Sequence, residues 1–115
     1  MTTHQGSCHC GAVTYKVETD FGSPFQCNCS FCKRRATTMQ KVEENDFELL
    51  TGQDKLSRYG GREFSKHFFC SNCGIHCFTR ADYKGAVFYM MNVACFDDVN
   101  PWELSPSLFD GATKL

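Results

Sequence analysis

Three short motifs hold most of the nine cysteines of this 115-residue chain. They are Cys8-His9-Cys10, Cys27-Asn28-Cys29-Ser30-Phe31-Cys32 and Cys70-Ser71-Asn72-Cys73. Turns of the form C-x-C or C-x-x-C point two sulfurs at one tetrahedral ion, whereas disulfides usually join distant segments. An odd number of cysteines also cannot all pair within one chain. The spacing therefore favours metal-bound thiolates over a disulfide framework.

Two of these motifs together provide four sulfurs, the number that a closed structural zinc site needs. The donors would be Cys8 and Cys10 with Cys70 and Cys73. Such a site would tie the first part of the chain to a hairpin about sixty residues later. Structural zinc contributes roughly 10 to 16 kcal/mol in small peptides, comparable with a domain's whole stability of about 5 to 15 kcal/mol. We predict a structural zinc site here.

The remaining motif leaves a set of three thiols, Cys27, Cys29 and Cys32. Three protein ligands plus one open position are typical of a catalytic zinc, because the open position admits water or a substrate atom. Two alternatives remain on spacing alone: Cys77 or Cys95 closes the site as a fourth ligand, or all three are free thiols.

A basic run follows the third of these thiols. Lys33, Arg34 and Arg35 could hold the carboxylates of an anionic substrate. The alternative is that they form the solvated face of a short helix.

Several other reactive side chains have simpler interpretations. His9 and His76 stand beside cysteines of the four-sulfur set and are expected to pack or to support the ligands. Cys77 and Cys95 lie in apolar segments and are expected to be buried thiols. No spacing argument places His67, although a strand could carry it to the site.

Alternating and aromatic-rich segments predict a mainly β protein with one or two short helical turns. We expect a short helix that Ser30 caps and that runs through Lys33, Arg34 and Arg35. Gly60-Gly61 should end the strand before it, and Trp102 should pack on the sheet. The expected strands are 13–18, 38–42, 47–50, 56–59, 64–69, 75–80 and 86–94. The last is a continuous apolar run suited to a central strand. A strand, a C-x-x-C-G turn and a second strand make a zinc-knuckle hairpin, and the length favours one domain over residues 1–115.

Charge and hydropathy exclude several classes of function. The formal net charge is −1 with both signs interspersed, so nucleic acid is an improbable partner. The first residues have no secretory signal pattern, and the longest apolar stretch is too short to span a bilayer. We therefore expect a cytoplasmic protein that does not enter membranes. The sequence carries no signal for an oligomeric state.

Three segments in register resemble the signature motifs of the glutathione-dependent formaldehyde-activating enzyme family, to which centromere protein V is related. They are residues 6–13 (GSCHCGAV), 27–35 (CNCSFCKRR) and 69–76 (FCSNCGIH). The resemblance spans about residues 6–97. It implies a β-tent fold and two zinc ions per chain, one structural on the four-sulfur set and one catalytic on Cys27, Cys29 and Cys32. The enzymes that name the family are longer, so their glutathione contacts cannot be transferred to this chain.

The resemblance leads to a specific hypothesis about chemistry. A small thiol such as glutathione would occupy the open zinc position as its thiolate and add to a small aldehyde such as formaldehyde, or the reverse reaction would run. This is a carbon-sulfur lyase activity of the S-hydroxymethylglutathione synthase type. The alternatives are a non-enzymatic zinc module for binding a partner, and a redox or metal sensor whose three thiols release zinc on oxidation.

Overall fold

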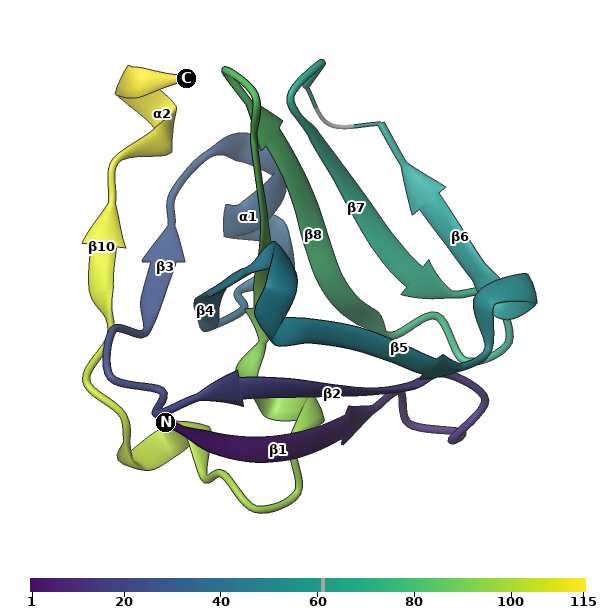
Figure 1. Cartoon of the computed structure of the whole chain (residues 1–115). Coiled ribbons are helices and arrows are strands. Elements are labelled where there is room, and N and C mark those ends of the chain that lie inside the picture. Colours follow the sequence, from purple (N-terminus) through teal and green to yellow (C-terminus); the bar gives the residue numbers. More distant parts are fainter. Residues whose placement is uncertain (61) are drawn as a thin grey trace.

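Two β-sheets make up this computed structural model, which describes residues 1–60 and 62–115 (Figure 1). The smaller sheet has the order β1-β2-β5, formed by β1 (Thr2–Ser7), β2 (Thr14–Thr19) and β5 (Phe47–Thr51). Its strands run across the direction of the strands in the larger sheet (Figure 1). The predicted mainly β class is confirmed.

The larger sheet has seven strands in the order β10-β3-β4-β9-β8-β7-β6. Only the β10–β3 pair is parallel among the pairings described. The strands are β3 (Phe25–Cys27), β4 (Met39–Glu43), β6 (Leu56–Tyr59), β7 (Ser65–Cys70), β8 (His76–Tyr83), β9 (Ala86–Asn92) and β10 (Ser107–Phe109). All seven predicted strands are present, and β9 lies in the middle of the sheet as expected.

Sequence patterns missed the strands β1, β3 and β10, which are polar or only three residues long. Gly61, expected to end a strand together with Gly60, lies outside the described residues. Trp102 does not pack on a sheet: its side chain is 90% exposed in a 3₁₀ turn, so that prediction was wrong.

Short helices connect the strands. They are α1 (Ser30–Arg35), α2 (Gly111–Lys114) and the 3₁₀ turns η1 (Glu44–Asp46), η2 (Gln53–Lys55), η3 (Val93–Cys95) and η4 (Pro101–Glu103). The predicted short helix is confirmed, but its N-cap is Cys29 and not Ser30, because Cys29 Sγ accepts the backbone N–H of Cys32. In the part of the chain described, no helix is both long and apolar enough to cross a membrane.

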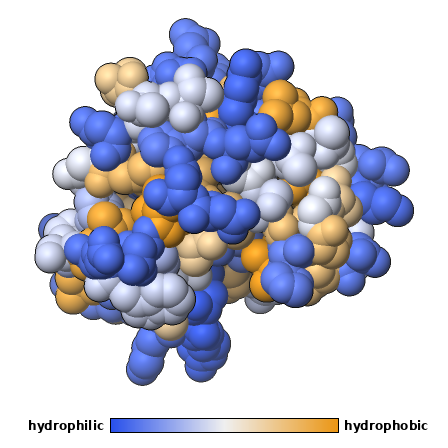
Figure 2. Space-filling view, turned by 90° about the horizontal axis from the view of Figure 1, so that it is seen from below, coloured by the Kyte–Doolittle hydropathy of each residue, from blue (hydrophilic) through white to orange (hydrophobic). Residues whose placement is uncertain are grey.

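Alternation along β2 places the core between the two sheets. Tyr15 and Val17 are buried, and the ring of Tyr15 meets Phe78 of β8 edge-on at 5.7 Å. Lys16, between them in the sequence, is exposed. The molecule seen from below is accordingly covered mostly by hydrophilic side chains, with smaller apolar areas between them (Figure 2).

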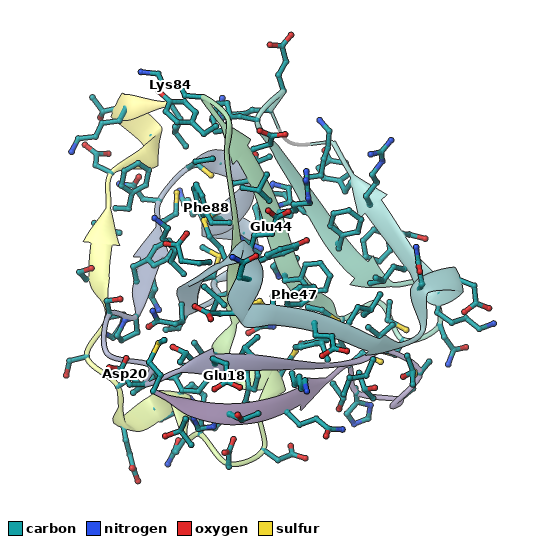
Figure 3. The ribbon with its side chains drawn as sticks, viewed as in Figure 1. Glu18, Asp20, Glu44, Phe47, Lys84 and Phe88 are labelled. Atoms are coloured by element: carbon teal, nitrogen blue, oxygen red, sulfur yellow. The ribbon has the colours of Figure 1, made fainter. Side chains whose placement is uncertain are left out.

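The central strand β9 is apolar on both faces. Met91 is fully buried in the core, while Phe88 and Met90, on the opposite face of the pleat, line an open cavity. In the view of Figure 3, the side chain of Phe88 lies between β3 and β8. The continuous apolar run therefore reflects two environments, a packed core and a cavity wall.

Candidate metal and substrate site

Four sulfurs converge where the turn after β1 meets the turn between β7 and β8. The Sγ atoms of Cys8, Cys10, Cys70 and Cys73 all lie within 4.8 Å of one another. Cys10 Sγ is 3.6 Å from Cys8 Sγ and 3.7 Å from Cys70 Sγ. A tetrahedron of sulfurs about 2.3 Å from zinc has edges of about 3.8 Å, so this donor set fits a zinc ion. It also links the small sheet to the large one.

The three-thiol set forms a separate cluster at the end of β3 and the start of α1. The Sγ atoms of Cys27, Cys29 and Cys32 lie within 4.8 Å of one another, and all three residues are buried. The backbone N–H of Cys29 donates to Cys27 Sγ, and that of Cys32 donates to Cys29 Sγ, both at 3.4 Å. Such bonds favour the thiolate form that metal binding requires.

The local environment shifts the pKa values of the thiols in different directions. Burial raises the pKa of Cys32 to about 12, against the opposing charge of Arg35. Burial also acts to raise the pKa of Cys29, but hydrogen bonds from the backbone and thiol of Cys32 outweigh it, so the pKa of Cys29 is lowered. Hydrogen bonds from the backbone of Cys10 and from the backbone of Ile75 lower the pKa of Cys73 to about 6.

The two remaining cysteines lie elsewhere. Cys77 is fully buried and Cys95 is 9% exposed, both in the core between the sheets. Cys95 Sγ donates to the backbone carbonyl of His76 at 3.7 Å. Neither belongs to a group of potential metal ligands among the described residues.

Arg35 lies directly beside the three thiols. Its Nη2 donates to Cys32 Sγ at 3.1 Å, and its Nη1 lies 2.6 Å from His76 Nε2. The other two residues of the basic run differ: Lys33 and Arg34 are exposed, and Arg34 Nη1 donates to the carbonyl of Ser30 within the same helix. The basic run is thus divided between the site and the surface.

Two histidines support the wall next to the cluster. His67 stacks on Phe31 with ring centroids 3.9 Å apart, and its Nδ1 lies 2.8 Å from Thr79 Oγ1, which is 3.0 Å from His76 Nε2. Burial and the nearby charge of Arg35 lower the pKa of His67 to about 4 and that of His76 to about 3. Both imidazoles are therefore neutral at pH 7. His9 is exposed.

The segment from β10 to α2 packs against the three-thiol motif. Asn28 Nδ2 donates to the Asp110 carboxylate at 3.1 Å, and Asn28 Oδ1 accepts the N–H of Ala112 at 2.9 Å. Gly111 lies so close that a Cβ there would be 2.6 Å from Cys27 Sγ. Spacing of cysteines could not reveal this contact, since the two segments are about eighty residues apart.

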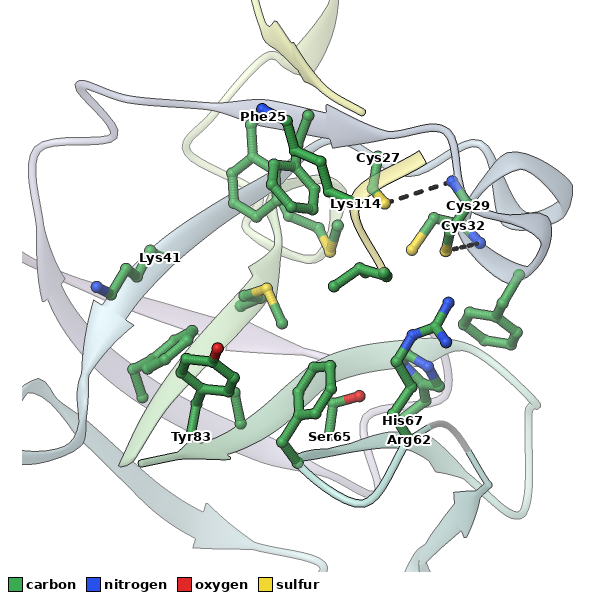
Figure 4. A pocket seen from close by; sticks show the side chains of 18 of the residues that line it. Phe25, Cys27, Cys29, Cys32, Lys41, Arg62, Ser65, His67, Tyr83 and Lys114 are labelled. Carbon is green, nitrogen blue, oxygen red and sulfur yellow. Dashed lines mark hydrogen bonds between the residues drawn. The ribbon is translucent and has the colours of Figure 1, made fainter. Parts of the chain in front are cut away.

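A cavity of about 940 Å³ opens beside the three thiols. The cysteines lie at one end in the view of Figure 4, with Lys41 and Tyr83 at the other. Cys27, Cys29 and Cys32 all line it, whereas the cysteines of the four-sulfur set are absent from its described lining. Of Lys33, Arg34 and Arg35, only Arg35 lines this cavity.

Comparison with known proteins agrees with the motifs. The model of the family "Glutathione-dependent formaldehyde-activating enzyme" matches residues 3–110. A protein of Halomonas elongata described as "Putative glutathione-dependent formaldehyde-activating enzyme" is 32% identical over 79 residues, covering 60% of this chain and 50% of that protein. The match thus spans about half the length of this curated relative. The crystal structure of a Rhodobacter sphaeroides protein superposes with a TM-score of 0.82 at 34% identity, over 91% of this chain and 99% of that one.

These findings define a mainly β protein with two cysteine clusters that could hold metal ions. The chain belongs to the glutathione-dependent formaldehyde-activating enzyme family.

Proposed function

We propose that this protein is a zinc-dependent carbon-sulfur lyase that adds a small thiol, such as glutathione, to a small aldehyde such as formaldehyde, or releases it. This is chemistry of the S-hydroxymethylglutathione synthase type. The reacting sulfur of the substrate thiol would bind at the open position of a zinc ion held by Cys27, Cys29 and Cys32. Cys8, Cys10, Cys70 and Cys73 would hold a second, structural zinc, giving two ions per chain in a single cytoplasmic domain over residues 1–115.

One contrast between the two cysteine clusters carries the proposal. The three-sulfur set forms part of a cavity wall, so a ligand can approach it. The four-sulfur set has the donor number of a closed site and connects two sheets. Catalytic zinc sites keep one position open, whereas structural sites have four protein ligands. Donor number and access support this division between chemistry and scaffold.

A zinc ion held by the three thiolates would supply a positive charge that lowers the pKa of a thiol bound beside it. The chain's own groups then hold the site in shape. The two backbone N–H donors orient Cys27 and Cys29, and the guanidinium of Arg35 holds Cys32. The imidazole of His67 lines the same cavity, and burial with the charge of Arg35 lowers its pKa to about 4, so it adds no positive charge to the site at pH 7.

The proposed reaction balances without an oxidant or a second cofactor. The thiol loses its proton, and its sulfur forms a bond to the carbonyl carbon. The π-electron pair of the carbonyl moves to oxygen, which takes up one proton. Thiolate addition to formaldehyde is chemically easy, so the protein contributes mainly orientation and thiol activation.

Titration of cobalt-substituted protein with glutathione tests the proposal. Glutathione should change the sulfur-to-cobalt charge-transfer band, and S-methylglutathione, which lacks the thiol, should leave it unaltered. Cys29→Ser should abolish the change, and measurement of formaldehyde adduct exchange by NMR should show the matching loss of activity. An unchanged band in the intact protein would rule out the open site and favour a purely structural role for both metals.

A further inference from the structure

The cavity beside the three thiols has an unusual lining for a reaction between a polar tripeptide and a one-carbon aldehyde. Its walls are mainly apolar side chains contributed by β3, β4, β7 to β10 and the connecting segments. Six of them are Phe25, Met39, Phe64, Phe88, Met90 and Phe109. Formaldehyde needs no such wall. Glutathione would place amides against it, and burying amides without hydrogen-bond partners is costly.

The apolar lining is separate from the core between the two sheets, and part of it, including the buried Met39, packs with the three cysteines in a second cluster. Phe88 and Met90 point away from the core on the opposite face of β9, while Met91 packs into it. Both are half-buried, so a ligand can still cover apolar surface there. Ligand pockets are typically apolar with a few converging polar groups, and this wall has that character.

The charged side chains in the described lining of the cavity are all positive. The charged side chains among its described lining are Arg35, Lys41, Arg62 and Lys114, and no acidic residue is among them. Lys41 Nζ lies 4.5 Å above the ring of Phe88 and 3.6 Å from Glu43. That ion pair is exposed on both sides, so solvent weakens the neutralisation of Lys41. Arg35 lies beside the thiols and Figure 4 shows Arg62 next to His67 on the same side, whereas Lys41 lies at the opposite end. An anionic group at that end would meet the positive charge of Lys41.

We propose that the substrate is a thiol adduct with an apolar, preferably aromatic, body next to the reacting sulfur and an anionic group at its far end. This inference rests on the proposed function, since the sulfur is assigned to the three-thiol cluster. The apolar body could enter with the thiol or with the aldehyde. In both cases the product is the same class of S-(1-hydroxyalkyl) compound, formed by the balanced addition described above.

Isothermal titration calorimetry on the zinc-loaded chain tests the proposed substrate class with a set of matched thiols. The probe is 4-(mercaptomethyl)benzoate, compared with 3-mercaptopropanoate, which lacks the ring, and phenylmethanethiol, which lacks the carboxylate. Burial of the ring should strengthen binding about tenfold or more over 3-mercaptopropanoate. Loss of the carboxylate should weaken binding several-fold, and added salt should reduce that difference. Equal or tighter binding of 3-mercaptopropanoate and glutathione would overturn the inference.

Variants on one strand provide the structural control. Phe88→Ala should reduce the preference for the ring-bearing thiol by about tenfold, because it removes apolar surface from the wall. Val87→Ala, the adjacent position on the other face of β9, should preserve the preference. A preference that survives Phe88→Ala with an unchanged melting temperature would place the ring elsewhere and contradict the proposal.

Two further measurements separate the possible failures. If the thioether 4-(methylthiomethyl)benzoate binds as tightly as the thiol, the sulfur does not meet the cysteines and the proposed function fails, whereas the comparison with and without the ring still tests the cavity. Glutathione mixed with 4-formylbenzoate or with formaldehyde identifies the source of the apolar body. If NMR shows faster adduct exchange for glutathione with 4-formylbenzoate than with formaldehyde, the apolar body belongs to the aldehyde. If exchange is faster only when 4-(mercaptomethyl)benzoate replaces glutathione, the apolar body belongs to the thiol. No acceleration for either aromatic partner would overturn the inference.

Discussion

Arg35 and Cys32, three residues apart on one short helix, are joined by a hydrogen bond of 3.1 Å from guanidinium Nη2 to thiol Sγ. The same guanidinium reaches His76 on β8, so it links the three-thiol cluster to the large sheet. Groups that orient metal ligands in this way commonly change metal affinity by roughly 10- to 100-fold when removed. If the three thiols hold a metal ion, Arg35 would position Cys32 for it.

We predict that Arg35→Met weakens the second zinc by roughly 10- to 100-fold and leaves the first zinc in place. Competition with a chromophoric chelator, which resolves two classes of zinc, measures this. Lys33→Met and Arg34→Met remove neighbouring exposed charges and serve as controls that should retain both affinities. Equal losses in all three variants would mean that overall charge, and not the contact with Cys32, governs the site.

The two cysteine clusters should differ in what their loss does. We predict that Cys70→Ser, which breaks the link between the sheets, leaves the chain largely unfolded, because structural zinc contributes an energy comparable with the whole fold. Cys29→Ser should retain the fold but lose activity. Circular dichroism with thermal melts, alongside zinc content per chain, distinguishes the outcomes. If both variants unfold alike, both metals are structural.

Gly111 should tolerate no side chain. A Cβ would lie 2.6 Å from Cys27 Sγ and 3.3 Å from Cys29 Cβ, so Gly111→Ala should displace either α2 or the cluster. We expect weaker binding of the second zinc and a lower melting temperature, by chelator competition and calorimetry. Gly60→Ala, where a Cβ meets no atom within 4 Å, is the matched control. Wild-type zinc affinity in Gly111→Ala would show that the segment does not constrain the cysteines.

Neutral His67 should make stability depend on pH. Burial, with the charge of Arg35, lowers its pKa from 6.5 to about 4 in the folded chain. Between these values the unfolded chain binds the proton and the folded chain does not, so stability is lost as pH falls from 6.5 to about 4 and levels off below that. The full loss is up to about 3 kcal/mol.

Urea unfolding between pH 7 and 4 checks this prediction. His67→Gln should show a shallower loss of stability with falling pH than the wild type, while His76 keeps its own contribution. His9→Gln, at an exposed position, should retain the wild-type profile. An identical pH dependence in His67→Gln would exclude His67 as a source of the loss.

Local spacing and alternation were sufficient for much of this protein. The C-x-C and C-x-x-C turns bring their own sulfurs together, so both donor sets could be named from the sequence, and four sulfurs from two motifs indeed converge. The helix at Ser30 and the strands around the cysteine turns followed from residues adjacent in the chain. The metals, the roles of the two sets and the single domain stay predictions.

Tertiary structure alone decided what surrounds the thiols. Arg35 turns toward Cys32 while Lys33 and Arg34 face solvent, because successive helical positions point about 100° apart and only one direction meets β8. The apolar run of β9 did not disclose that Phe88 faces a cavity, since a buried face and a cavity wall require the same residue types. The contact of Gly111 with Cys27 joins segments that no local pattern relates. The sequence determined which cysteines form clusters, and long-range packing determined which of these clusters lines a cavity.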